Sequence, residues 1–180
     1  MSNETRSATF RIKVAHVDSA RVHSDDLRVC FEADPVADGV RTLPDVDVWQ
    51  PSLIPDPSLL REFSTRGCEW YEFSRRYSIQ LQSRSEDCER LRLLAWKVRL
   101  VLLHRGHDPH RNVAVAMKQH LEQLECQHRW KAGLMVGGYL YPLRSEVIRS
   151  GGLWFDRHKA WMLPDREAWN HIQSLLPGDF

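Results

Sequence analysis

Three histidines follow an apolar run in the segment HRGHDPHRN, where His104, His107 and His110 stand three residues apart. Imidazole groups transfer protons, bind metals and, when protonated, attract anions. In an open α/β sheet, ligands bind beyond the carboxyl ends of the strands, often at a helix N-terminus. The segment therefore predicts a small-ligand site, to which a neighbouring strand would add a carboxylate. The residues of this predicted site are Glu32, His104, His107 and Asn112.

The same histidines lack the other features of a metal centre or a catalytic site. H-x-x-H-x-x-H in a loop is not a recognised metal signature, and solvated loop histidines are the simpler interpretation. The chain contains no P-loop, no G-x-G-x-x-G or G-x-S-x-G motif, and no cysteine–histidine context that marks a nucleophile. We therefore expect no metal or other cofactor. The sequence assigns no catalytic residue and leaves enzymatic activity undecided.

A second candidate lies in GGLWFDRHKAWMLPD, where two tryptophans flank a charged tetrapeptide. If residues 156–159 form a turn, Trp154 faces Trp161 across a hairpin and Phe155 faces Ala160. A tryptophan pair in the core of a small module is the main interpretation. Stacking of a nucleobase on one indole and docking of a protein partner are the alternatives.

Cations concentrate around this hairpin. Residues 127–163 carry a net charge of +4, whereas residues 1–126 sum to −1 and residues 164–180 to −2. Such a segment can neutralise nucleic-acid phosphates, although a solvated surface produces similar runs. The residues predicted to contact nucleic acid are Arg144, Arg149, Arg157 and Lys159.

The elements that must position these candidates alternate along the chain. Strands are predicted at residues 9–17, 27–33 and 98–105, with helices between and after them. Asp108, ahead of Pro109, is expected to cap the helix after the last strand. This order predicts a layered α/β domain.

The helical pattern fades at residues 125–133, and we place a domain boundary there. The prediction is an α/β domain at residues 1–126 and a small α+β module, a β-hairpin with short helices, at residues 127–180. No apolar run reaches the roughly 20 residues of a membrane span, and the first residues lack an apolar signal core. Four scattered cysteines suit reduced thiols. Together these features predict a cytoplasmic protein without membrane contact.

The segments PSLLREF, EWYEFSRRYSIQL and VRLVLLHRGHDPHRNVAVAMKQHLEQL resemble, in the same order, the bacterial YeaO-like family, domain of unknown function 488. The resemblance covers residues from about 9 to 125 and implies a compact α/β domain without an established activity. The matching positions are Leu60, Arg61, Phe63, Phe73, Tyr77, Leu81, Leu100, Leu102, Leu103, Asp108, Asn112, Ala114 and Leu121.

The chain departs from this family at the hallmark strand end V-D-R-x-W-P-R-G. Here the strand reads RVCFEADPVADG, in which Glu32 replaces the aspartate and Ala33 and Ala37 replace the two arginines. If those arginines hold an anion in relatives, this chain has lost them. The resemblance then implies a degenerate domain that is reused as a scaffold or a partner surface.

Residues from about 137 to 170 resemble a second small module, domain of unknown function 5710. Ile148 departs from its pattern, in which a lysine is usual. Such modules accompany primases, helicases and mobile-element proteins, so the resemblance implies an association with proteins that act on DNA. The matching positions are Tyr141, Pro142, Gly151, Gly152, Trp154, Lys159, Trp161 and Pro164.

The sequence as a whole predicts a noncatalytic nucleic-acid-associated accessory protein of a phage or another mobile element. A small-ligand-binding protein or an enzyme that uses residues 104–112 is the first alternative. A protein–protein adaptor or inhibitor is the second.

Overall fold

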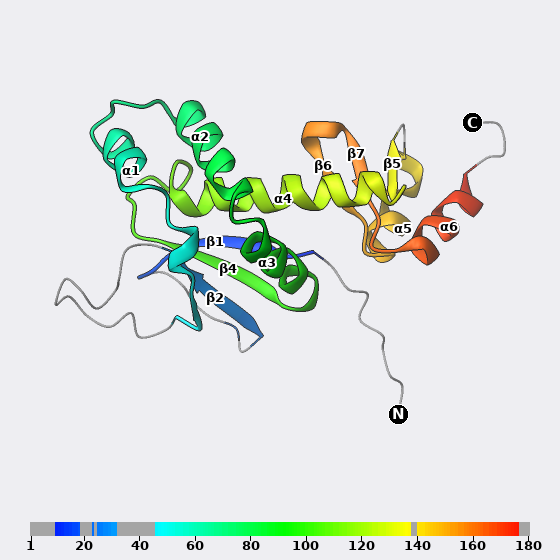
Figure 1. Cartoon of the computed structure of the whole chain (residues 1–180). Coiled ribbons are helices and arrows are strands. Elements are labelled where there is room, and N and C mark those ends of the chain that lie inside the picture. The colour runs from blue at the N-terminus through cyan, green and yellow to red at the C-terminus, as the bar shows by residue number, and fades with distance from the viewer. Residues whose placement is uncertain (1–9, 19–22, 24, 32–45, 138–139, 177–180) are drawn as a thin grey trace. The chain divides into compact units, whose positions relative to one another are not determined.

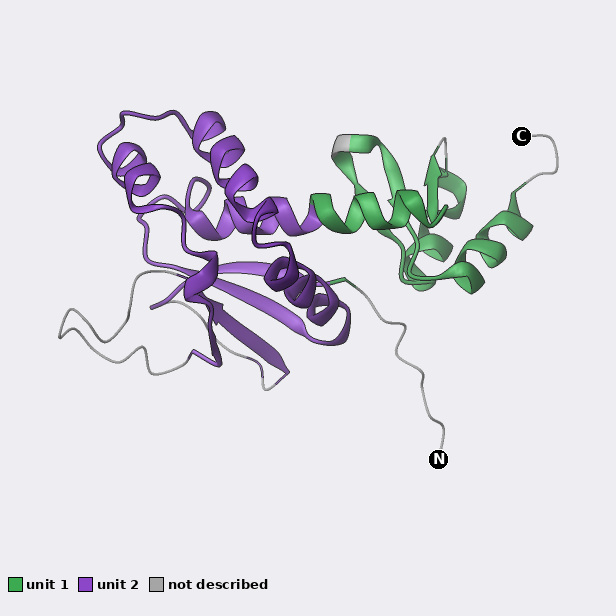
Figure 2. Cartoon of the chain, in the orientation of Figure 1, with its two compact units in different colours: residues 1–10, 123–180 green, residues 11–122 purple. Residues whose placement is uncertain are grey.

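The computed structural model describes residues 10–18, 23, 25–31, 46–137 and 140–176, with only the backbone of Arg157. The chain forms two compact units, which Figure 2 colours separately. Residues 11–122 form one, here called the α/β unit, and residues 1–10 with 123–180 form the other, here called the hairpin unit. The division between residues 122 and 123 lies near the predicted boundary at residue 126.

A four-stranded sheet forms the centre of the α/β unit. Its strands are β1 (Ile12–His16), β2 (Asp26–Cys30), β3 (Val48–Trp49) and β4 (Arg99–His104), in the order β1-β4-β2-β3. Every pairing between neighbouring strands is parallel. The predicted α/β class is therefore confirmed, and β3 is a strand that the sequence pattern did not reveal.

Strand β4 is the most deeply buried strand of this sheet. Leu100 and Leu102 are fully buried, and the intervening Val101 and the following Leu103 are almost so. A parallel sheet covered on both faces requires such a continuous apolar run, because alternate side chains point to opposite faces. The residues that follow β4 are thus held at the carboxyl edge of a rigid sheet.

The α/β unit also contains helices (Figure 1). They are α1 (Pro57–Ser64), α2 (Trp70–Gln82), α3 (Ser85–Lys97) and the first part of α4 (Val113–Lys131). Each apolar face follows the 3.6-residue helical period, and the buried side chains of α2, for example, are Phe73, Tyr77 and Leu81. None of the helices in the described part of the chain is long and apolar enough to cross a membrane.

Helix α4 continues further than the fading sequence pattern suggested. It ends at Lys131, and Gly133 follows with a φ of +65°. This is the left-handed conformation, which glycine adopts more readily than any other residue. The amide of Gly133 donates to the carbonyl of Trp130, and the amide of Leu134 donates to that of Arg129. This glycine C-cap is the physical stop signal of the helix.

The hairpin unit is an α+β module, as predicted. Strands β5 (Met135–Gly137), β7 (Ala160–Met162) and β6 (Leu153–Phe155) form an antiparallel sheet in that order. Helices α5 (Arg144–Arg149) and α6 (Arg166–Leu175) accompany the sheet. Two 3₁₀ turns complete the unit, η2 at Tyr141–Leu143 and η3 at Asp156–His158.

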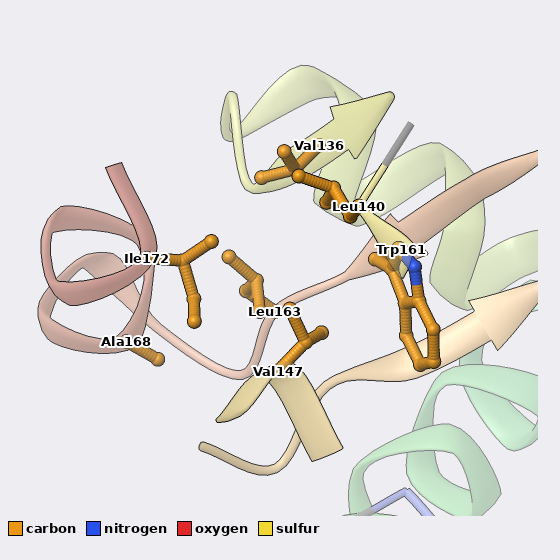
Figure 3. Packing of buried hydrophobic residues seen from close by; sticks show 7 residues of the cluster. All are labelled: Val136, Leu140, Val147, Trp161, Leu163, Ala168 and Ile172. Carbon is orange, nitrogen blue, oxygen red and sulfur yellow. The ribbon is translucent and has the colours of Figure 1, made fainter. Parts of the chain in front are cut away.

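The predicted register of the β6–β7 hairpin is confirmed, with Trp154 opposite Trp161 and Phe155 opposite Ala160. The two indoles meet edge to face, with 5.4 Å between ring centroids. Trp161 is only 8% exposed, whereas Trp154 is 40% exposed. Figure 3 shows Trp161 among the side chains of the core of the unit, which are Val136, Leu140, Val147, Trp161, Leu163, Ala168 and Ile172. The pair is therefore primarily a packing feature.

Gly152, between α5 and β6, allows a close approach of two backbone segments. A Cβ atom at this position would lie 2.5 Å from Cγ1 of Val147 and 2.7 Å from its carbonyl oxygen. The amide of Gly152 donates to that same carbonyl. The glycine pair in GGLWF thus ends α5 and starts the strand that carries Trp154.

Candidate functional site

The predicted ligand loop begins at His104, the last residue of β4. Its Nδ1 lies 3.0 Å from the carbonyl oxygen of Gly106, and because that oxygen can only accept, Nδ1 must carry the proton. The ring also meets His16, its register partner at the end of β1, with 5.3 Å between centroids. His104 is 4% exposed and is packed into the sheet edge.

The next polar residues of the loop bind its own backbone. One carboxylate oxygen of Asp108 accepts from the amides of His110 and Arg111, which forms a local turn. Oδ1 of Asn112 accepts from the amide of Val115 at 3.0 Å, and its Nδ2 donates to the carbonyl of Asp108 at 2.9 Å. Asn112 is therefore the cap of α4, and the prediction that Asp108 caps this helix is wrong. Residues 109–112 form bends ahead of the helix rather than its first turn.

The three described residues of the predicted ligand site differ in their surroundings. His104 and Asn112 are buried and contact the loop backbone, whereas His107 is exposed to solvent. Glu32 lies outside the residues that the structure describes. Within the described ranges, no three histidine, cysteine, aspartate or glutamate side chains are placed to hold a metal ion.

A serine–histidine pair that the sequence did not indicate joins α2 to α4. Oγ of Ser78 lies 2.9 Å from Nδ1 of His120. Burial lowers the pKa of His120, because the imidazolium form is disfavoured away from water. Among the described residues, no carboxylate is hydrogen-bonded to this ring to orient it as in a catalytic triad. The pair fastens two helices together.

Two of the residues predicted to contact nucleic acid form exposed ion pairs within the hairpin unit. Arg149, at the end of α5, pairs with Glu146 one turn earlier. Lys159 donates to the Asp156 carboxylate at 2.6 Å, across the hairpin turn. Hydrogen bonds from Lys159 and then from Trp154 lower the pKa of Asp156. Exposed pairs of this kind are weak, so a phosphate can compete for either cation.

The other two predicted contacts also lie in the hairpin unit. Arg144 is exposed at the first residue of α5. Arg157 lies in the 3₁₀ turn η3, and its side chain is outside the described part of the structure. The four predicted contacts thus lie on α5 and at the turn between β6 and β7.

The structure also shows a cavity of about 300 Å³ within the hairpin unit that sequence reasoning missed. It lies between the last turns of α4 and the turn η3, and Trp130 at its rim is 70% exposed. A helical stripe at positions i, i+3, i+4, i+7 and i+8 is visible in the sequence once Gly133 is taken as the helix stop. The lining residues are Gln123, Cys126, Gln127, Trp130, Lys131 and His158.

Comparison with known proteins identifies a family for most of the chain. Residues 11–133 match the family described as the inactive DUF488-N3 subclade. No curated protein and no solved structure matches the chain. The family match ends before residues 137–170, whose resemblance to domain of unknown function 5710 stays a prediction. The chain belongs to the inactive DUF488-N3 subclade, which confirms the predicted relationship to domain of unknown function 488.

Proposed function

We propose that this protein is a noncatalytic nucleic-acid-associated accessory protein, in which the hairpin unit contacts the nucleic acid and the α/β unit is a scaffold. The observation that carries the proposal is the end of α4, where the exposed indole of Trp130 stands beside the exposed Lys131. An exposed aromatic ring next to cations is the combination with which proteins bind bases and phosphates together.

The noncatalytic part of the proposal is supported by the loop after β4. A catalytic or ligand-binding loop keeps polar groups available for substrate, whereas His104, Asp108 and Asn112 bind backbone groups of their own loop. The description of the family as inactive supports the same reading.

The phosphate contacts would come from cations that already sit in water. The side chains of Lys159 and Arg149 are 71% and 73% exposed. Their ion pairs with Asp156 and Glu146 are therefore weak, and little free energy is lost when a phosphate replaces either carboxylate. Each phosphate contact releases counterions, and binding should therefore weaken steeply as salt is added.

The cellular setting belongs to the proposal as well. The predicted resemblance of residues 137–170 to a module that accompanies primases and helicases supports an origin in a phage or another mobile element. The four cysteines are free thiols, which supports a cytoplasmic location.

The proposal is tested by titrating labelled single-stranded and double-stranded DNA with the full chain at about 50 and 200 mM salt. We expect binding at low salt that weakens at high salt. The double variant Arg157→Glu with Lys159→Glu should bind more weakly and show a salt slope smaller by about 1–2.

The matched control is Lys13→Glu with Lys97→Glu, which makes the same change in net charge at exposed positions of the α/β unit. Its binding should fall less than that of the hairpin variant. Absence of binding at low salt, or equal losses in both double variants, would overturn the proposal.

A further inference from the structure

The cavity at the end of α4 has one wall made by a single helical face. Gln123, Cys126, Gln127, Trp130 and Lys131 recur at the spacing that places side chains above one another along a helix. Cys126 is buried at 3% exposure, whereas Trp130 and Lys131 extend into solvent. The wall therefore changes from a buried thiol to an exposed indole and ammonium within two turns.

The opposite wall is His158, and the hairpin turn holds it in place. Its ring stacks on Phe155 with 5.3 Å between centroids and 13° between planes. Lys159 follows in the left-handed conformation, with a φ of +48°, and its amide and ammonium both bond to Asp156. Both walls belong to the hairpin unit, drawn in green in Figure 2. The cavity exists before any ligand arrives, which lowers the entropy lost on binding.

The chemistry of the walls selects the class of ligand. The six lining residues include an indole, a lysine and a histidine, and no carboxylate. A flat apolar group suits the indole, and an attached anion suits the lysine. Residues 127–163, which include most of this surface, carry the net charge of +4. An unpaired nucleobase on its sugar-phosphate chain has both properties.

We propose that this cavity receives one unpaired nucleobase of a single strand, stacked on Trp130 between α4 and His158, with its phosphate at Lys131. This inference rests on the proposed function and adds to it a preference for single strands and a specific seat for a base. In a duplex the bases are stacked on one another, and their faces are not available to the indole. The cavity therefore contributes nothing to duplex binding.

The test compares three labelled probes on the full chain: a short thymidine homopolymer, an abasic strand of the same length, and a duplex. The thymidine strand should bind best. Trp130→Ala should weaken its binding roughly 5- to 150-fold, the loss of one base stack, and should leave the abasic strand and the duplex unaffected. Trp130→Phe, which keeps an aromatic face, should restore most of the affinity.

The matched control is Trp49→Ala, because Trp49 is a 43% exposed tryptophan in the α/β unit. It should bind all three probes like the unmodified protein. If no probe binds, the proposed function itself fails. If the thymidine strand binds but Trp130→Ala leaves its affinity unchanged, or lowers the affinity of all three probes equally, the inference alone is overturned. An unchanged affinity of Trp130→Ala for the thymidine strand would indicate that the cavity holds another group, such as a side chain of a protein partner.

Discussion

After β4, His104, Asp108 and Asn112 turn their polar atoms toward the backbone of their own loop, whereas in the last turn of α4 Trp130 and Lys131 extend into water beside a cavity. Both regions contain histidines and lie where helices and strands meet. The sequence offered the loop as a small-ligand site, the first alternative to a nucleic-acid role, because the loop lies at the carboxyl edge of a parallel sheet.

The difference between the regions lies in what each polar or aromatic group already contacts. A buried polar group that is fully hydrogen-bonded stabilises the fold and has little left to offer a ligand. An exposed indole above a preformed cavity is costly in water and gains from being covered. Position in the fold therefore identifies a candidate site, but the hydrogen bonds decide whether it is free to act.

The largest expected effect comes from a substitution in the core of the hairpin unit, which holds the hairpin turn in place. Trp161→Ala should lower the free energy of unfolding by about 3–5 kcal/mol, because it deletes a large buried side chain. Unfolding in urea, followed by circular dichroism, measures this loss. The cross-strand partner provides the control: Trp154→Ala removes a ring that is 40% exposed and should cost clearly less. Equal losses of unfolding free energy in the two variants would show that Trp161 is no more important to the core than Trp154.

A smaller effect is expected in the loop. Asn112→Ala removes the cap of α4 and the bond to the carbonyl of Asp108, so unfolding should become easier by about 1–2 kcal/mol. Binding of single-stranded DNA, measured well below the melting temperature, should not change. His107→Ala, at an exposed position of the same loop, should alter neither property. A loss of DNA affinity in Asn112→Ala without a loss of stability would reverse the roles assigned to the two regions.

The smallest effect concerns pH. Because burial lowers the pKa of His120 below its usual 6.5, the unfolded chain binds a proton there more readily than the folded chain. Stability should therefore fall as the pH drops below about 6.5, with a slope of at most ~1.4 kcal/mol per pH unit from this group. Burial raises the pKa of Glu122, which acts in the opposite direction at lower pH.

The contribution of His120 is isolated by comparing the pH profiles of the unmodified protein and His120→Asn. In the variant, the free energy of unfolding should no longer decline between pH 6.5 and the lowered pKa of the histidine. Parallel profiles would mean that His120 is not buried in the neutral form.

Periodicity in the sequence was sufficient to predict some of these elements. The apolar run of β4 and the alternation around Trp154 and Trp161 predicted a buried parallel strand and the correct hairpin register, since both depend on side-chain spacing alone. The spacing of residues between positions 57 and 121 also carried the family resemblance.

Other features depended on information that spacing does not contain. Asp108 and Asn112 are equally good cap residues by type, and only the path of the backbone selects Asn112. The exposure of Trp130 could not be predicted, because it depends on how much of α4 the hairpin turn leaves uncovered. Whether an aromatic side chain stays exposed depends on how the surrounding elements pack against it, and no local sequence pattern encodes that packing.

In our proposal, the hairpin unit contacts nucleic acid and the loop after β4 does not. Nuclear magnetic resonance of the ¹⁵N-labelled chain, titrated with a short single-stranded oligonucleotide, tests this claim residue by residue. The indole N–H signal of Trp130, assigned with Trp130→Phe, should shift with added oligonucleotide, while the amide signals of Gly106 and His107 stay in place. Shifts at Gly106 and His107 with an unmoved Trp130 signal would overturn the proposal.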